Sequence, residues 1–317
     1  MSIAPYIKEI GRGKEGARSL TAEQAHELMS QVLDGQASDL EIGAFAIAMR
    51  IKGESIEELA GFLRSVHERC IPLHPTQPSL VLPSYNGARK LPNLTALLAL
   101  LLAQEGVPVL VHGPEHDPGR VTTAEIFHTL GLPIAQDSAD IHAAWARREP
   151  VFIRTEALCP PLARLLDVRR VIGLRNPGHT VAKLLAPAQG RRSLRVVNYT
   201  HPEYGRTLAE FLAATRSDAM LMRGTEGEPV ADPRRLPRLD VFIDGQLRAE
   251  LSRAAQEGVL TEMPVLPRSH DAATTSLYIQ SVVSGEKPAP APLQQQVEAL
   301  LAALAALAQH TSKELSA

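Results

Sequence analysis

The chain has 317 residues, 44% hydrophobic and 21% charged, and this composition is typical of a globular protein rather than a disordered one. Its two cysteines, Cys70 and Cys159, are too few for a disulfide framework or a cysteine-based metal site, and they favour a reducing, cytoplasmic location. The net charge of −2 gives no sign of a nucleic-acid partner, and no apolar run is long enough to span a membrane.

The first seventy residues are predicted to form three short helices. A hydroxyl residue followed three positions later by Glu or Gln marks a helix start, because each side chain accepts a hydrogen bond from a backbone N–H at that end. Gly35 and Gly53 fall where the first two helices should end. The capping pattern occurs three times, at Thr21 and Gln24, at Ser38 and Glu41, and at Ser55 and Glu58.

The second of these helices carries an apolar stripe at helical spacing. Its members are three or four residues apart, so that they share one face, and they are Leu40, Ala44, Ile47 and Ile51. Such a face either packs inside a helical bundle or is buried against a partner subunit, and the sequence leaves both alternatives open.

A larger α/β region follows the proline-rich link from Pro72 to Pro78. Ser79–Pro83 and Val107–Val111 are predicted to be buried strands, and the apolar segment Leu94–Glu105 between them is predicted to be a helix that begins at Asn93. A β–loop–α–β order implies parallel strands joined by a crossover helix.

Further elements continue this alternation. Helices are predicted at Thr122–Leu130 and Pro202–Ala214, and strands at Ser193–Asn198 and Ala219–Met222. Beyond Asp232 the pattern weakens, until residues 297–308 suggest a packed terminal helix rich in Ala and Leu. The predicted fold class is therefore α/β, with a small helical N-terminal domain and a larger α/β domain around a central, mostly parallel sheet.

Charge is unevenly distributed along the chain. Nine Lys or Arg residues lie between Arg164 and Arg206, including Arg191 and Arg192, and only Asp167 and Glu203 oppose them. This asymmetry predicts a positive surface on an otherwise acidic protein. The alternative is a set of ordinary solvated helix faces.

The segment from Ser38 to Glu54, followed by Glu57 to Gly61, resembles the N-terminal helical domain of glycosyltransferase family 3, to which anthranilate phosphoribosyltransferase belongs. The match includes Gly43, Arg50 and Lys52. The resemblance implies the nucleoside phosphorylase/phosphoribosyltransferase fold. It also implies a helical dimerisation domain at residues 1–72, completed by helices from about 160–187, an α/β domain at 73–317, and a homodimer formed through the helices.

An enzyme of this family holds phosphoribosyl pyrophosphate and magnesium, and its phosphate loop is dominated by glycine. Here the corresponding loop runs from Ser84 to Lys90, and its replacements include Tyr85, Arg89 and Lys90. Bulky side chains obstruct close approach of the backbone to phosphate, although the two cations attract it.

Two further motifs of the family are altered. Val111 and Pro114 stand where the enzyme has lysine and asparagine, and Gly227, between Glu226 and Glu228, stands where it has a metal-binding aspartate. Changes in three motifs argue against efficient catalysis, so we predict no catalytic residue and no metal site.

The altered loop, the segment Lys8–Lys14 and the segment Arg175–Lys183 together resemble the YbiB subgroup of anthranilate phosphoribosyltransferase-like proteins. That resemblance implies binding of nucleic acid, DNA or RNA, through its backbone and without sequence preference. The Arg175, His179 and Lys183 side chains are spaced by four, so a helix would place them on one face, although Pro177 favours a helix start after Arg175.

The predicted nucleic-acid or phosphate site has two parts: the altered loop with the residues that follow it, and the segment Arg175–Lys183. We expect His112 to be a structural residue at a strand end more than a ligand. The complete set is Asn86, Gly87, Arg89, Lys90, Asn93, Thr95, His112, Arg175, His179 and Lys183.

Two other functions remain open from the sequence. The first is a phosphoribosyltransferase that uses phosphoribosyl pyrophosphate and Mg with an unknown acceptor. The second is a small-anion sensor that kept the pocket but not the chemistry. Under the nucleic-acid hypothesis no cofactor is expected.

Overall fold

A computed structural model of the chain describes residues 2–188, 193–258 and 263–315, and Arg191 and Arg192 of the basic run lie outside these ranges. The chain divides into two compact units. The helical unit comprises Met1–Ile71 and Thr155–Pro187, and the α/β unit comprises Pro72–Arg154 and Ala188–Ala317. The sequence had suggested a first domain of residues 1–72 completed by helices from about 160–187.

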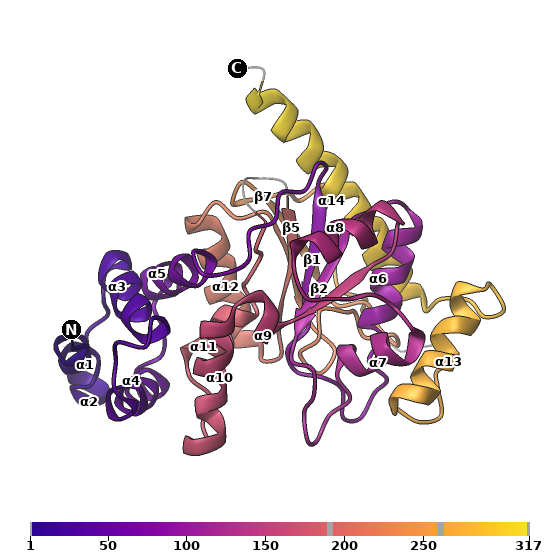
Figure 1. The fold of residues 1–317 in the computed structure, drawn as a ribbon. Coiled ribbons are helices and arrows are strands. Elements are labelled where there is room, and N and C mark those ends of the chain that lie inside the picture. Colours follow the sequence, from indigo (N-terminus) through magenta and orange to yellow (C-terminus); the bar gives the residue numbers. More distant parts are fainter. Residues whose placement is uncertain (1, 189–192, 259–262, 316–317) are drawn as a thin grey trace. The chain divides into compact units, whose positions relative to one another are not determined.

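The helical unit is built from two distant stretches of chain. Each of the three predicted capping boxes is present, with the hydroxyl accepting from the third backbone N–H of its helix. The helices of the first stretch are α1 (Ala4–Ile10), α2 (Gly13–Gly16), α3 (Ala22–Leu33), α4 (Asp39–Lys52) and α5 (Ile56–His67); those of the second are α9 (Thr155–Leu158), α10 (Pro160–Ile172) and α11 (Pro177–Ala182) (Figure 1).

Helices from the second stretch complete the packing of the first. α3 packs along α5, while α10 contacts α3 and α11 contacts both α4 and α5. α4 buries Phe45, whose ring meets that of Phe62 edge-on with centroids 5.8 Å apart. The apolar stripe of α4 faces the other way, since Leu40 is 84% exposed and Ile51 is 64% exposed. The alternative in which that stripe packs inside the bundle is therefore wrong.

The α/β unit contains one eight-stranded sheet in the order β3-β4-β2-β1-β5-β6-β7-β8. The first six strands of this order run parallel, and β7 and β8 are antiparallel. The predicted fold class, with its mostly parallel sheet, is confirmed. The strands are β1 (Ser79–Pro83), β2 (Val109–Gly113), β3 (Ile134–Ala135), β4 (Val151–Arg154), β5 (Ser193–Tyr199), β6 (Ala219–Arg223), β7 (Leu239–Ile243) and β8 (Gln246–Leu247).

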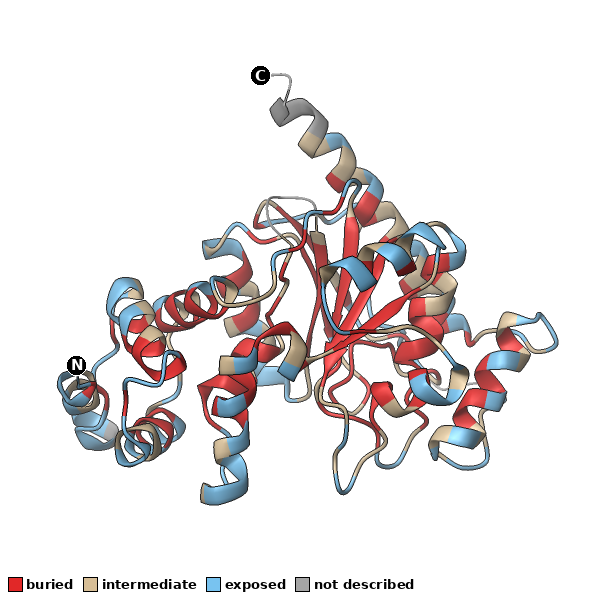
Figure 2. Ribbon diagram, in the orientation of Figure 1, coloured by how far each residue is buried: buried red, intermediate tan, exposed pale blue. Residues whose placement is uncertain are grey.

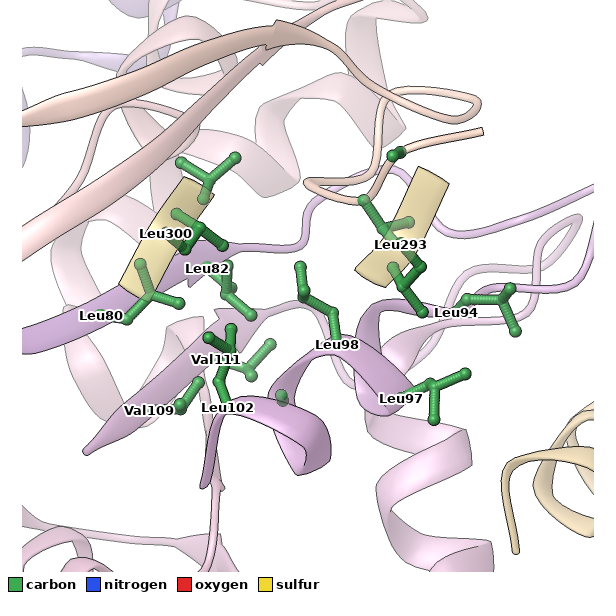
Figure 3. Packing of buried hydrophobic residues seen from close by; sticks show 14 of the residues in the cluster. Leu80, Leu82, Leu94, Leu97, Leu98, Leu102, Val109, Val111, Leu293 and Leu300 are labelled. Carbon is green, nitrogen blue, oxygen red and sulfur yellow. The ribbon is translucent and has the colours of Figure 1, made fainter. Parts of the chain in front are cut away.

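Helices cover the sheet, and the inner strands are buried along their length (Figure 2). Leu80 and Leu82 of β1 pack with Leu98 of α6, Val111 of β2 and Leu300 of α14 (Figure 3). Among the described residues, no helix is both long and apolar enough to cross a membrane. The helices of this unit are α6 (Thr95–Gln104), α7 (Thr123–Leu130), α8 (Ser138–Ala146), α12 (Pro202–Ala214), α13 (Ala272–Val283) and α14 (Ala291–Leu315).

The carboxyl ends of parallel strands meet at one edge of a sheet, which is where α/β proteins bind their ligands. β1 lies between β2 and β5, and β6 follows β5. The loops that leave β1 and β6 therefore emerge at the same edge. This arrangement brings the predicted phosphate loop and the acidic Glu226–Glu228 segment together.

Candidate anion-binding site

The loop that follows β1 is bent so that several of its backbone N–H groups are available to one acceptor. Gly87 has φ of +69°, and a Cβ atom there would lie 3.0 Å from the carbonyl oxygen of Val121. The next residue, Ala88, donates its N–H to that same oxygen at 2.9 Å. The loop is thus held against the chain before α7, and only glycine fits its tightest point.

A carboxylate of the protein itself occupies the space in front of these groups. Oε1 of Glu228 accepts the N–H of Asn86 at 2.8 Å and the N–H of Gly87 at 2.7 Å. Glu228 is only 1% exposed. Consecutive backbone N–H groups that converge on one point form a typical anion site, and here the anion is Glu228.

The second carboxylate oxygen of Glu228 is equally surrounded by donors. Its Oε2 accepts hydrogen bonds from the Ser84 hydroxyl, from Thr123 Oγ1 at 3.3 Å, and from Asn93 Nδ2 and Thr95 Oγ1, both at 3.4 Å. Asn93 and Thr95, predicted from the sequence to bind phosphate, thus donate to Glu228 in this structure. Their binding of an external phosphate stays a prediction.

Glu226 occupies a second set of donors in the same loop. Its Oε2 accepts the N–H groups of Arg89, Lys90 and Leu91 at 2.8, 3.0 and 3.1 Å. Partial burial raises the pKa of Glu226, but these three donors outweigh it and hold the pKa below its ordinary value. The Arg89 and Lys90 side chains are exposed, so the loop binds an anion with its backbone and presents cations to solvent.

Gly227, between the two acids, could not be replaced by aspartate in this conformation. Its φ is +89°, and a Cβ atom would lie 1.8 Å from Nδ2 of Asn86. That nitrogen donates to the carbonyl oxygen of Glu226 at 3.0 Å, which fixes it in place. Glu226 itself has φ of +53°, a left-handed conformation that costs energy in a residue other than glycine.

The two acids do not fit a magnesium ion. A carboxylate that binds a cation must turn an oxygen toward it, whereas both oxygens of Glu228 and Oε2 of Glu226 face N–H or O–H donors. In the described part of the chain, no group of three or more His, Cys, Asp or Glu side chains could hold a metal. In this structure the loop donors that would bind the phosphates of phosphoribosyl pyrophosphate bind carboxylates of the protein instead.

His112, at the end of β2, is buried beside this loop. Its carbonyl oxygen accepts the N–H of Ser84 at 2.8 Å. A Cβ atom on the following residue, Gly113, would lie 1.8 Å from the carbonyl oxygen of Ser84, so the two strand ends approach as closely as backbones can. His112 is 1% exposed, which agrees with the structural role expected for it.

The remaining predicted residues lie in the helical unit. Asn176 caps α11: its side chain accepts the N–H of Gly178, and His179 reaches back to the N–H of Asn176 at 3.3 Å. Arg175 precedes this helix, as Pro177 had suggested. His179 is buried. Burial, together with the positive charges of Arg175, Arg169 and Lys183, lowers its pKa to about 4, so the imidazole is neutral at pH 7.

We define the cationic cluster as Arg169, Arg175 and Lys183, the three residues of this segment whose charges lower the pKa of His179. Arg169 and Arg175 are exposed and Lys183 is partly exposed. The nearby Asp167 pairs with the adjacent Arg170 at 3.2 Å. The α10–α11 segment thus keeps an excess of positive charge.

Sequence reasoning missed the role of Glu226 and Glu228. It assigned them to a damaged magnesium site, and it did not include Ser84 or Thr123. The signal that could have identified the pair is local. Glu226 and Glu228 flank a glycine that stands where the enzyme has a metal-binding aspartate. Two carboxylates in that turn could replace bound phosphate.

A family model described as the helical bundle domain of the glycosyl transferase family matches residues 4–70. The YbiB protein of Escherichia coli strain K12, described as uncharacterized, is 39% identical over 306 residues, which cover 96% of this chain and 94% of that protein. An anthranilate phosphoribosyltransferase of Synechococcus strain JA-3-3Ab is 27% identical over 292 residues, covering 91% and 83%.

Solved structures agree with this fold. The anthranilate phosphoribosyltransferase of Thermus thermophilus superposes with a TM-score of 0.71 at 20% identity, covering 96% of this chain and 89% of that one. The Saccharomyces cerevisiae enzyme in complex with PRPP and Mg gives a TM-score of 0.66 at 12% identity, covering 98% of both chains.

Proposed function

This chain belongs to the anthranilate phosphoribosyltransferase-like proteins of glycosyltransferase family 3 and is related to YbiB along nearly its whole length, and we propose that it is a non-catalytic homodimer that binds nucleic acid without sequence preference. The observation that carries this proposal is the filled phosphate loop. Glu228 and Glu226 take the donors that an activated ribose donor would need.

The energetics of the loop support loss of catalysis. A phosphate that enters the loop must displace the buried carboxylate of Glu228. The Ser84 hydroxyl and five other donors would then need a new hydrogen-bond acceptor. A single restored residue would not reverse this, since Gly227 lacks room for an aspartate side chain. Binding of phosphoribosyl pyrophosphate would thus require rearrangement of the Glu226–Glu228 turn.

Positive side chains support a polyanionic partner. The cationic cluster of the helical unit surrounds a neutral histidine, and Arg89 and Lys90 project from a loop whose acids are occupied by backbone donors. In the described residues no ion pair joins either of these two side chains to an acid. Phosphates that bind such cations release condensed counterions, so affinity should fall steeply with salt and vary little with sequence.

The test is a salt titration of binding to a labelled single-stranded oligonucleotide. We expect log Kd to rise linearly with log salt concentration and oligonucleotides of unrelated sequence to bind within a few-fold of each other. Replacement of Arg89, Lys90, Arg175 and Lys183 by glutamate should weaken binding by at least a hundredfold at low salt while the thermal unfolding midpoint stays within a few degrees.

A matched control reverses four exposed arginines of the α/β unit: Arg147, Arg148, Arg206 and Arg268. This control has the same net charge as the test variant. It should lose much less affinity, because net charge acts mainly on the rate at which protein and oligonucleotide encounter each other. Equal losses in both variants would remove the chosen residues from the proposal. No measurable binding at low salt by the unaltered protein would end it.

The homodimer is proposed on the apolar face of α4. Leu40, Ile47 and Ile51 are exposed on it, and an apolar groove between α1 and α4 continues it. Replacing Ile47 and Ile51 by glutamate should shift the protein from dimer to monomer in light scattering. A monomeric unaltered protein would contradict this part of the proposal.

The second candidate is a phosphoribosyltransferase with an unknown acceptor, favoured by the full-length relationship to the Synechococcus enzyme. It requires the Glu226–Glu228 turn to leave the loop when ligand binds. Millimolar phosphoribosyl pyrophosphate with magnesium would then raise the unfolding midpoint by several degrees. Release of pyrophosphate in the presence of an aromatic acceptor would establish it.

A further inference from the structure

The helical unit contains both cysteines of the chain, although 88 residues separate them in the sequence. Cys70 follows α5, and Cys159 directly precedes α10. The N–H of Ile71 donates to the carbonyl oxygen of Leu158 at 3.0 Å, so the two segments run side by side at this point. Neither segment belongs to the anion-binding loop or to the cationic cluster.

The two thiols share one acceptor. Sγ of Cys70 lies 3.3 Å from the carbonyl oxygen of Val66, and Sγ of Cys159 lies 3.9 Å from the same atom. The two sulfurs therefore lie near each other around one carbonyl oxygen. Both are free in this structure; Cys159 is fully buried and Cys70 is partly exposed.

The surroundings shift the pKa values of the two sulfurs in opposite directions. The adjacent Cys70 thiol lowers the pKa of Cys159; burial opposes this, but the N–H of Leu162 and the charges of Arg69 and Arg164 lower it further. Cys159 and burial raise the pKa of Cys70. The pair therefore combines an accessible sulfur of raised pKa with an adjacent sulfur of lowered pKa.

We propose that Cys70 and Cys159 are an oxidation site that closes to a reversible intramolecular disulfide, with a hydroperoxide as the oxidant. Sγ of Cys70 attacks one peroxide oxygen, the O–O bond breaks, and the departing oxygen takes a proton and leaves as water. Sγ of Cys159 then loses its proton, attacks Sγ of Cys70 and displaces the remaining oxygen, which takes up a proton and leaves as a second water. In sum, two thiols and one hydrogen peroxide give one disulfide and two waters.

The structure sets the relative rates of the two steps. Formation of the first adduct is slow, because the raised pKa of Cys70 keeps its thiol protonated, whereas closure is faster, because Cys159 is adjacent and its lowered pKa favours loss of its proton. The disulfide joins residues 1–71 to residues 155–187, the two stretches that make up the helical unit. A cross-link over so long a loop restricts the unfolded chain strongly.

The experiment treats the reduced, full-length protein with hydrogen peroxide and then unfolds it to count free thiols. We expect both thiols to disappear, the intact mass to fall by two hydrogens, and the chain to remain a monomer on a denaturing gel without reductant. Dithiothreitol should restore both thiols. The oxidised protein should unfold roughly 5 °C higher than the reduced one.

Because the chain has only two cysteines, the unaltered protein alone decides the outcome. Retention of the Cys159 thiol while Cys70 gains oxygen atoms would overturn the proposal, as would disulfide-linked dimers in place of the internal bond. Cys70→Ser is the matched control. It should keep one unreacted thiol and show neither the mass loss nor the change in unfolding midpoint.

Discussion

The loop after β1 and the α10–α11 segment both carry residues predicted to bind phosphate, yet they differ in how their charge is balanced. In the loop, the backbone N–H groups donate to carboxylates of the protein itself. Glu228 accepts from one set of these donors and Glu226 from the other. In the α10–α11 segment, the charges of the cationic cluster help to lower the pKa of a buried histidine, which stays neutral. The loop donors are thus occupied by internal anions, whereas the α10–α11 segment contributes positive charge.

The largest expected effect concerns the internal anion. Glu228→Ala should lower the free energy of unfolding by about 4 kcal/mol, because it leaves several buried donors without an acceptor. Urea denaturation measures this change. Glu226→Ala is the control and should cost much less, since Glu226 is partly exposed and water can reach its donors. Equal costs would mean that the two sets of donors do not differ as described.

The next effect separates the two regions by affinity. Reversal of the cationic cluster to glutamate should weaken oligonucleotide binding about a hundredfold and reduce the slope of log Kd against log salt by about 2. Reversal of Arg89 and Lys90 should cost about tenfold, since the adjacent Glu226 carboxylate already lowers the local potential. A larger loss from the loop than from the cluster would invert the comparison.

A smaller effect tests how tightly the loop is closed. Gly227→Ala and Gly285→Ala both place a side chain at positive φ, which costs about 1 kcal/mol each. Only the first also clashes, with Asn86, whereas nothing lies within 4 Å of a Cβ atom at Gly285. Gly227→Ala should therefore cost about 2 kcal/mol more in urea denaturation. A difference near zero would mean that the Glu226–Glu228 turn moves away easily.

The smallest effect concerns pH. The pKa of His179 is about 4 in the folded protein against about 6.5 in the unfolded chain, so only the unfolded chain takes up a proton between these values. Stability is therefore complete above pH 6.5 and is lost as the pH falls toward 4, with about 2 kcal/mol lost by about pH 5. His179→Gln removes this titration, so its free energy of unfolding should fall less between about pH 7 and about pH 4.5. A parallel decline in both proteins would contradict a neutral His179.

Local patterns were sufficient to predict much of the fold. The capping boxes could be predicted because the two residues of each box are only three positions apart. The β–α–β unit could be predicted from short apolar runs separated by turns. Periodicity identified the apolar stripe of α4. It could not predict whether other helices of the unit cover that stripe, because this depends on where those helices lie. β7 and α13 were missed because the pattern beyond Asp232 is weak and β7 acquires its place by pairing with β6.

The candidate site was predicted only in part. Asn86, Gly87, Arg89 and Lys90 lie in one loop and donate backbone N–H groups to Glu228 and Glu226, while their binding of an external phosphate stays a prediction. Their occupant could not be predicted, since Glu228 lies 142 positions from Asn86 in the sequence. Contacts over such distances depend on the order of strands in the sheet, which no local pattern contains.

The helical unit has a consequence for synthesis on the ribosome. Its first five helices emerge early, but α10 and α11, which cover α3 and α5, are encoded about a hundred codons later. At ordinary translation speeds the nascent helices wait about ten seconds for these partners. During that interval their uncovered apolar surface is open to chaperones, and to a second nascent copy on the same messenger.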